Sequence, residues 1–288
     1  MSTDYLGLPF WKRMYGHGDM GTLDATMLTA FIGNVDRRAL AGMLPEHPRL
    51  KLVPQTPLVV IQSDFTHVVD NGDPDGNDYR YHEVMFAAIV GGVGGALPSL
   101  MPLILFVDDP IIMASGREFY GFPKVMGEVV YEPRSAVVRQ TYFPGGVKTT
   151  REVMRASWND RAPFVARILT SAADAATQLA RLAGVDDDTF DFVTNLASSP
   201  FGRVINLRQV ADLTNPRRAS RSELTLFKPK VVEPKLIGAI SNYRLELPDE
   251  PVWSLGKRLF GNVAPKTIFA FEWQARFLVT TGLVIDTW

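Results

Sequence analysis

Residues 84–107 read VMFAAIVGGVGGALPSLMPLILFV, a run of 24 residues without a charged side chain. An apolar run of this length is long enough to cross a bilayer as a helix. Its middle, however, is GGVGGALPSLMP, with four glycines and two prolines, which interrupt helices. The pattern therefore predicts two buried strands joined by a Gly/Pro connection, and no membrane partner.

The segments on either side of this pair have a similar character. They are short, rich in Val, Ile, Phe and Thr, and bounded by Gly, Pro, Asn or Asp, which is typical of strands. The segments predicted as strands are 56–69, 79–90, 103–107, 110–118, 127–133, 136–143, 235–248 and 275–286. The first two flank a turn-rich loop and predict a hairpin.

Helices are fewer. Residues 36–45 form a short candidate helix with Asp36 as its N-cap, and residues 162–184 have Ala and Leu at helical spacing between Pro163 and Gly184. Many strands with a few helices at the margins predict an α+β fold with a mostly antiparallel sheet. No linker is evident, so we expect one domain over residues 1–288, with a helical insertion at about 150–195.

Composition excludes several kinds of function. The chain has 288 residues, a formal net charge of −1 and no cysteine. Nothing in this balance favours nucleic acid as a partner, and thiol chemistry and cysteine metal sites are excluded. The four histidines show no metal-ligand spacing, so we expect no metal and no cofactor. The first residues show no secretory pattern, which predicts a cytoplasmic protein.

One lysine needs an explanation. The stretch GREFYGFPKVMGE, residues 116–128, places Lys124 behind a proline and among aromatic and apolar residues, although lysine is rarely buried. Lys124 could simply extend its ammonium group to water. Alternatively, burial in apolar surroundings lowers the pKa of a lysine, and the neutral amine can attack a carbonyl carbon. The residues alone leave both readings open.

The same stretch resembles the lysine motif of the acetoacetate decarboxylase family, in which GRE is followed by Pro-Lys-Lys and a glycine. Residues 35–50, 81–90 and 277–288 also resemble segments of that family, so the resemblance covers most of the chain. It implies a mostly antiparallel, strongly curved, barrel- or cone-like sheet around one pocket. It also implies a Schiff-base lyase that acts on a small oxo acid or aldehyde, in a homo-oligomer.

Position by position, the resemblance assigns Lys124 as the Schiff-base lysine and Glu83 as an active-site glutamate that moves protons. Gln62, Phe122, Val125 and Met126 are expected to line the substrate pocket. Val125 stands where the family has its second lysine, and Gln62 stands where it has a further glutamate. Thr26 or Met27, in an ungapped reading, takes the place of a substrate-binding arginine, so acetoacetate is expected to be a poor substrate.

Arg117 and Glu118 precede the lysine in the same motif. The two could form an ion pair that braces the turn, or Arg117 could meet a substrate carboxylate. The reaction itself stays open between decarboxylation and aldol condensation with dehydration. A protein that binds an apolar metabolite without catalysis is the alternative outside enzymes.

Overall fold

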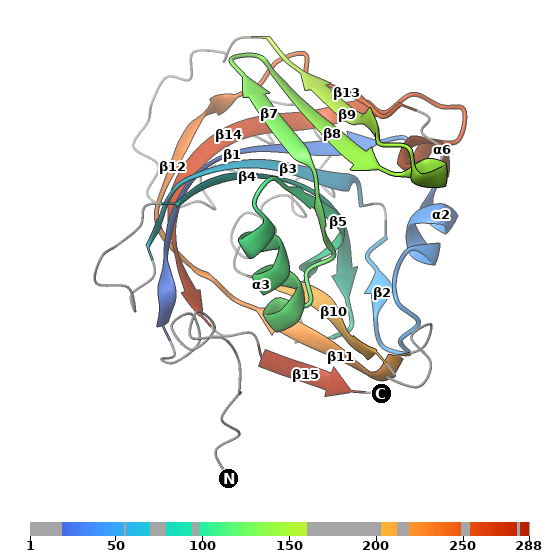
Figure 1. Ribbon diagram of the computed structural model, residues 1–288, viewed down its shortest axis with the longest axis vertical. Coiled ribbons are helices and arrows are strands. Elements are labelled where there is room, and N and C mark those ends of the chain that lie inside the picture. Colours follow the sequence, from blue (N-terminus) through green and yellow to red (C-terminus); the bar gives the residue numbers. More distant parts are fainter. Residues whose placement is uncertain are drawn as a thin grey trace.

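The computed structural model describes residues 19–54, 56–69, 79–93, 98–159, 203–211, 219–248, 254–280 and 283–287. Its strands form two sheets, and the larger has eleven strands. Nine of them pair in the order β12-β14-β1-β3-β4-β5-β10-β11-β15, while β2 pairs with β4 and β6 with β5. Figure 1 shows β12, β14, β1, β3 and β4 on one side of helix α3 and β10 and β11 on the other.

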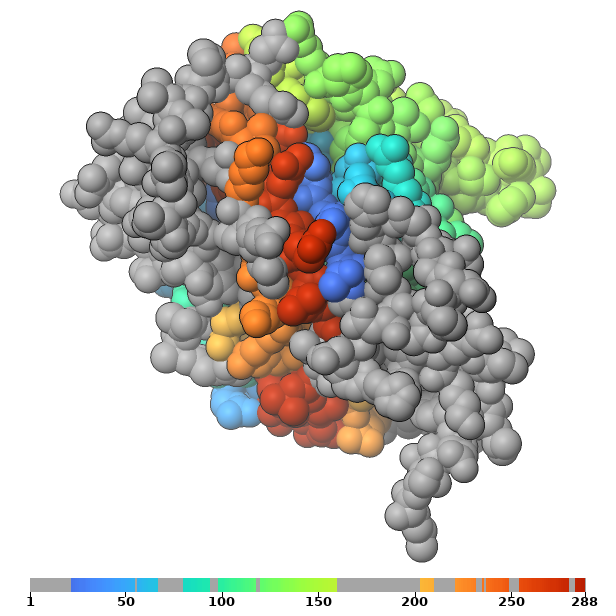
Figure 2. Space-filling model, turned by 90° about the vertical axis from the view of Figure 1, so that its left-hand side faces the viewer, coloured from blue at the N-terminus to red at the C-terminus, as the bar shows by residue number. Residues whose placement is uncertain are grey.

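The strands of the large sheet are β1 (Asp19–Gly33), β2 (Lys51–Leu52), β3 (Leu58–Val69), β4 (Tyr79–Gly91), β5 (Ser99–Val107), β6 (Lys124–Met126), β10 (Val204–Ala211), β11 (Ala219–Phe227), β12 (Lys230–Ala239), β14 (Lys266–Thr280) and β15 (Leu283–Thr287). All pairs are antiparallel except β5 with β10 and β5 with β6. Figure 2 shows β12, β14 and β1 side by side on one face of the molecule, in orange, red and blue. A mostly antiparallel sheet is therefore confirmed.

A second sheet of four strands lies against the first. Its order is β13-β9-β8-β7, with β7 (Glu128–Glu132), β8 (Ser135–Tyr142), β9 (Thr149–Ser157) and β13 (Arg244–Glu246). The helices are α2 (Arg37–Gly42), α3 (Pro110–Tyr120) and α6 (Leu255–Phe260), with a 3-10 turn at Pro144–Gly146. Among the described residues, then, strands dominate and helices are few, as predicted.

Alternate side chains of each strand enter two different cores. One core, the inter-sheet core, joins the large sheet to the small one and includes Phe86, Phe106 and Met154. The other, the α3-side core, lies on the opposite face of the large sheet and includes Ile61, Tyr81 and Leu105. Both faces of the central strands are therefore covered, which explains why residues 84–107 are almost continuously apolar.

The prediction for residues 84–107 is confirmed. β4 ends at Gly91, β5 begins at Ser99, and the two strands pair antiparallel from Glu83 with Val107 to Val90 with Ser99. Gly92 has a φ of 87°, and a Cβ there would lie 1.9 Å from the carbonyl oxygen of Arg49, so only glycine fits this turn. Within the described residues, no helix is long and apolar enough to span a membrane.

The prediction of a strand over 110–118 was wrong, because this segment is helix α3. Its β-branched start, Pro-Ile-Ile, resembles a strand, but the flanking residues cap a helix. The Asp109 side chain accepts hydrogen bonds from the backbone N–H groups of Ile111 and Ile112, both at 2.8 Å, and Pro110 takes the first helical position. At the other end Gly121 adopts the left-handed conformation, with a φ of 70°.

The remaining predictions of helices and strands have different outcomes. The helix capped by Asp36 is confirmed as α2, with its carboxylate 2.9 Å from Arg38 N and 3.1 Å from Ala39 N. The segment 235–248 is divided between β12 and β13, which belong to different sheets. The predicted helix at 162–184 lies outside the described residues. β9 occupies the start of the proposed insertion at about 150–195, which therefore cannot begin before residue 158.

The pairing of the described strands does not close the large sheet into the barrel-like form that the resemblance implied. The strand order begins with β12 and ends with β15, and no pairing joins these two strands in the described part of the chain. Closing a barrel requires such a pair, because every strand must have two neighbours. The correction leaves the predicted fold class in place and replaces a barrel by an open sheet.

The capping of α3 can be tested by replacing Asp109. The Asp109→Ala variant loses the acceptor for two backbone N–H groups, and we expect the free energy of unfolding to fall by about 1 kcal/mol. Urea denaturation followed by circular dichroism measures this change. Asp109→Asn, which keeps the acceptor, is the control, and an equal loss in both variants would contradict the capping role.

Candidate active site

The end of α3 delivers Lys124 to the sheet within four residues. Gly121 N–H donates to Arg117 O at 3.2 Å and Phe122 N–H to Gly116 O at 3.1 Å, which closes the helix. A Cβ on Gly121 would lie 2.8 Å from the backbone nitrogen of Arg208 on β10, so the turn also needs glycine for close packing. β6 then pairs with β5, with Lys124 beside Leu105.

The Lys124 side chain is buried. It is 7% exposed, and its Nζ contacts Glu83 Oε1 of β4 in a salt bridge. Two aromatic rings face the same nitrogen: the ring centre of Phe122 lies 5.6 Å from Nζ and that of Tyr81 5.9 Å. The lysine therefore does not extend to water, and the two residues singled out from the sequence meet in the interior.

Glu83 is held by its own strand and by the small sheet. Its carboxylate is on the α3-side face, and the residue is 8% exposed. Its backbone carbonyl accepts a hydrogen bond of 2.9 Å from the hydroxyl of Tyr131 on β7. Directly across the β3–β4 ladder lies Ser63, which is also buried. The backbone at Glu83 is thus held by the strand register and by the Tyr131 hydrogen bond, and both position the side chain on the α3-side face.

An apolar cavity of about 110 Å³ adjoins this pair, and both Glu83 and Phe122 line it. Its other walls come from β1, β3, β4, β5, β10, β11 and β14, and all its lining residues are apolar except Ser63 and Glu83. Among its described lining residues there is no arginine, lysine or histidine. The cavity is small beside the roughly 300–1,000 Å³ of drug-sized ligand sites, so it suits a small, largely apolar compound.

Gly116 is the closest neighbour of the lysine stem. A Cβ at this position in α3 would lie 2.6 Å from both Cδ and Cε of Lys124, closer than real Cβ contacts. The helix therefore passes over the lysine at a distance that only a missing side chain permits. This explains a glycine in the interior of a helix, where it otherwise lowers stability.

Buried tyrosines surround the pair as neutral groups. Burial, followed by the nearby Glu83 charge, raises the pKa of Tyr81 well above its usual value of 10.0. Burial likewise raises the pKa of Tyr131, with a further contribution from Tyr243. Both phenols stay protonated at neutral pH, and Tyr131 can therefore donate its hydrogen bond to the Glu83 carbonyl.

Only some of the predicted site residues lie together in the structure. Lys124, Glu83 and Phe122 lie together, and Met126 shares the face of Lys124 but is 37% exposed. Met27 lines the cavity, in place of the arginine expected there. Arg117 is exposed on α3. The side chain of Glu118 lies outside the described part of the structure, so the predicted ion pair is not tested.

Gln62 and Val125, which were expected to line the substrate pocket, lie on the other face of the sheet. Each is adjacent in sequence to a residue of the site, and strand side chains alternate between the two faces. Val125 pairs with Phe106 and packs on the inter-sheet core, and Gln62 pairs with Val84 of the same core. Neither therefore reaches the cavity beside Lys124.

Three neighbours of the pair were missed in the sequence, namely Ser63, Tyr81 and Gly116. Two of them follow from register. Tyr81 is two residues before Glu83 on the same strand, and Ser63 is its cross-strand partner. A hairpin register could have identified Ser63, but the loop between the strands is long, and the ladder has an irregularity between Phe65 and Val68. Gly116 indicated a tight bend in the sequence, but its contact with the lysine stem was missed because its segment was read as a strand.

Comparisons with known proteins concern the family and the fold of the chain. The model of the family "Acetoacetate decarboxylase (ADC)" matches residues 9–196. No curated protein matches the chain significantly. A solved acetoacetate decarboxylase superposes with a TM-score of 0.61 at 16% identity, over 99% of this chain and 96% of that chain.

Two further solved structures share the fold. The acetoacetate decarboxylase of Legionella pneumophila gives a TM-score of 0.58 at 15% identity, over 93% of this chain and 88% of its own. The enduracididine biosynthesis enzyme MppR, solved with the condensation product of pyruvate and imidazole 4-carboxaldehyde, gives 0.53 at 13% identity, over 92% and 88%. At these identities the structures establish a common fold, and the family match extends over most of the chain.

Proposed function

Because the chain belongs to the acetoacetate decarboxylase family, we propose that it is a lyase that forms a Schiff base between Lys124 and a carbonyl substrate. The observation that supports this most directly is the buried contact between Lys124 Nζ and Glu83 Oε1 at the edge of an apolar cavity. A lysine placed only for solubility or surface packing has no reason to be 7% exposed beside a carboxylate.

The apolar surroundings supply the neutral amine. Burial disfavours the ammonium and the carboxylate alike, and their attraction compensates for part of this cost. Transfer of one proton from Nζ to Oε1 removes both charges together. The products of that transfer are an amine with a lone pair and a carboxylic acid, which are the nucleophile and the general acid that imine formation needs.

In the proposed mechanism, the Lys124 nitrogen attacks the carbonyl carbon, and the carbonyl oxygen takes up a proton to give a carbinolamine. Glu83 then protonates the hydroxyl, which leaves as water, and an iminium ion forms. The electron pair of a bond on the adjacent carbon then moves toward the iminium nitrogen and gives an enamine. In decarboxylation a carbon–carbon bond breaks and carbon dioxide leaves, and otherwise a carbon–hydrogen bond breaks and the Glu83 carboxylate takes the proton. Protonation of the enamine carbon and addition of water release the product and restore the lysine.

The cavity favours a substrate with an apolar substituent. Its lining offers Ser63 as a hydrogen-bonding group but no cation that could pair with a substrate carboxylate, and Glu83 would repel one. A carbonyl compound whose remaining atoms are mostly carbon would be desolvated there at little cost. A free aldehyde or ketone meets this condition.

Decarboxylation and aldol-type condensation both start from the same iminium ion. The two solved decarboxylases and MppR, with its bound condensation product, are examples of different outcomes on one fold. The alternative of a non-catalytic binding protein would use the same cavity, but binding an apolar metabolite does not require a buried Lys–Glu pair at its edge. Trapping the imine separates these classes.

Borohydride reduction tests the nucleophile. With pyruvate, acetoacetate or benzaldehyde in turn, we expect the protein to gain the mass of one reduced adduct, located by peptide mapping at Lys124. Lys124→Met removes the adduct, whereas Lys148→Met, which changes an exposed lysine, leaves it intact. Glu83→Gln slows adduct formation by about 10²–10⁴-fold if the carboxyl group transfers the protons. Adducts confined to surface lysines with all three compounds would falsify the proposal.

Gly116→Ala tests whether the position of the amine matters. Because the new Cβ collides with Cδ and Cε of Lys124, the side chain must shift away from Glu83, and adduct formation should fall at least about tenfold. Alanine is the better helix former by up to about 1 kcal/mol, so the thermal midpoint should not fall in parallel.

The matched control for that variant is Gly42→Ala. Gly42 also lies in a helix, and a Cβ there meets no atom within 4 Å. We expect this variant to form the adduct at the rate of the unchanged protein. Equal adduct rates in both variants would show that the close approach of α3 does not position the lysine.

Acetoacetate should be a poor substrate, for the reason that the missing arginine suggested in the sequence. The cause is the absence of a cation among the lining residues of the cavity, since Gln62 and Val125 face away from it. Each unmet charged or hydrogen-bonded contact costs about 1–3 kcal/mol. Carbon dioxide release measures this, and a kcat within the usual enzymatic range of about 1–10³ s⁻¹ would contradict the prediction.

A further inference from the structure

A second cavity, of about 440 Å³, lies between the two sheets. Its floor is formed by side chains of β1, β3 and β14 on the inter-sheet face, where Glu272, Leu28 and Gln62 occupy one row across three neighbouring strands. Its roof comes from the small sheet, with Tyr131 on β7 and Trp158 just after β9. Because Gln62 and Ser63 are consecutive on β3, this cavity and the one beside Lys124 lie on opposite faces of the same strand.

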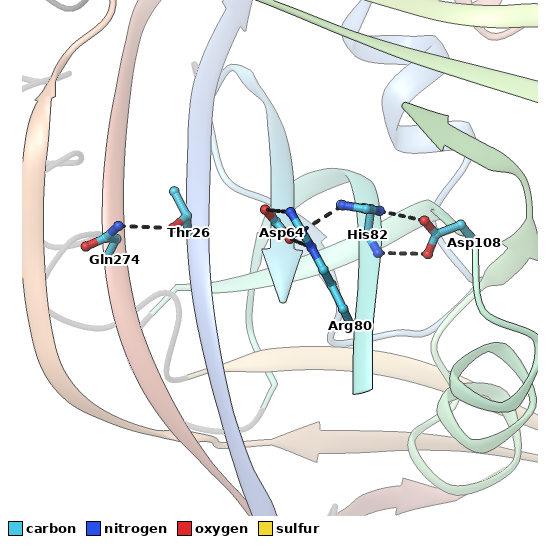
Figure 3. Close-up of polar contacts among 6 residues, drawn as sticks. All are labelled: Thr26, Asp64, Arg80, His82, Asp108 and Gln274. Carbon is cyan, nitrogen blue, oxygen red and sulfur yellow. Dashed lines mark hydrogen bonds and ion pairs between the residues drawn. The ribbon is translucent and has the colours of Figure 1, made fainter. Parts of the chain in front are cut away.

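The lining of this second cavity is acidic. Asp64, Glu132 and Glu272 all contribute to it, and none of its described lining residues is a lysine, arginine or histidine. Asp64 is paired with Arg80 at 2.9 Å and lies 3.5 Å from His82, as Figure 3 shows. Glu132 is exposed, whereas Glu272 is 9% exposed. The cavity thus opens to solvent at Glu132 and has a buried carboxylate on its floor.

Gln62 gives an independent indication of a ligand. The residue is 1% exposed, and its Nε2 donates to the hydroxyl of Tyr243 at 2.5 Å. Its Oε1 is buried and has no hydrogen-bond partner among the residues that the structure describes. A buried acceptor without a donor costs about 1–3 kcal/mol, and native structures contain few of them. Since Gln62 lines the cavity, a donor placed there would satisfy this oxygen.

The chemistry of the walls selects the kind of ligand. Carboxylates and an amide oxygen all accept hydrogen bonds, so an anion is disfavoured and a cation with N–H donors is favoured. In the described part of the chain, no group of three or more His, Cys, Asp or Glu side chains is arranged to hold a metal ion. Trp158, stacked on Tyr243 with ring centres 6.2 Å apart, and Tyr131 add aromatic surface that suits an organic cation.

We propose that the cavity between the two sheets binds a compound with a primary ammonium group and an apolar or aromatic body. The ammonium N–H groups donate to Gln62 Oε1 and to the carboxylate of Glu272. The body packs between Leu28 on the floor and Trp158 in the roof. This site does not depend on the chemistry proposed for Lys124, which lies on the other face of the sheet.

Isothermal titration with a matched pair of probes tests the site. The ion 2-phenylethylammonium and the neutral 2-phenylethanol have the same number of non-hydrogen atoms and differ in charge and donors. We expect the ammonium compound to bind at least about tenfold more tightly, because a hydrogen bond to a charged group is stronger than a neutral one. Calcium and magnesium chloride form a third arm, in which no binding is expected.

Variants locate the binding. Glu272→Gln keeps the shape of the side chain, removes its charge and should weaken ammonium binding at least about tenfold. Glu46→Gln makes the same change at an exposed position and should not alter it. Lys124→Met should bind the probe as the unchanged protein does, which separates this site from the proposed active site.

The outcomes are distinct. Equal binding of the two probes, binding of the metal ions instead, or loss of ammonium binding in Lys124→Met with retention in Glu272→Gln would each overturn the proposal. If Glu272→Gln does not fold, as judged by circular dichroism, the probe comparison on the unchanged protein still decides it. When the ammonium probe is added to the unchanged protein, the NMR signals that shift should include the indole N–H of Trp158. If that signal does not shift, the probe binds elsewhere and the proposal is wrong.

Discussion

The buried pair of Lys124 and Glu83 is the constraint on which the rest of the site depends. Two opposite charges taken out of water gain stability only if their geometry is good, and removal of one partner from such a pair typically costs about 3–5 kcal/mol. The chain satisfies this geometry with parts that are distant in sequence. Helix α3 brings the lysine to β6, and Tyr131 of the small sheet holds the backbone beside the carboxylate.

The pair also explains several glycines and turns that contribute no chemistry. Gly121 ends α3 in the left-handed conformation and lies against β10, so the chain can turn directly into β6. Gly116 leaves room for the lysine stem under the helix. Leu105 and Val107 of β5 lie between the two charged residues in the sheet, and the long side chains of Lys124 and Glu83 reach across that strand to meet. Small residues at the helix and apolar ones on β5 therefore serve a single contact.

Much of this could be predicted from the sequence, and the failures have definite causes. Runs of β-branched residues predicted β3, β4, β5, β7 and β8, because each is bounded by turn residues. The lysine motif and the resemblance together predicted a pair that the structure brings into contact. Helix α3 was missed because Ile111, Ile112 and Met113 were weighed by propensity, while the Asp109 cap and Pro110 decided the local structure.

The assignment of Gln62 failed for a different reason, which also shows how much depends on register. An ungapped resemblance aligns residues along the chain, but which face a side chain takes is set by pairing between strands. In the ladder from Val59 with Ala87 to Phe65 with Tyr81, Ser63 lies opposite Glu83 on one face, and Gln62 lies opposite Val84 on the other. A shift of one residue would exchange the two faces, move the serine to the inter-sheet cavity and bring the glutamine beside the lysine. A change of register would therefore alter the polar groups of both cavities on the two faces of β3 at once. One register determines the polar groups of both, and the apolar side chains that flank Gln62 and Ser63 on β3 specify that register because each must enter its own core.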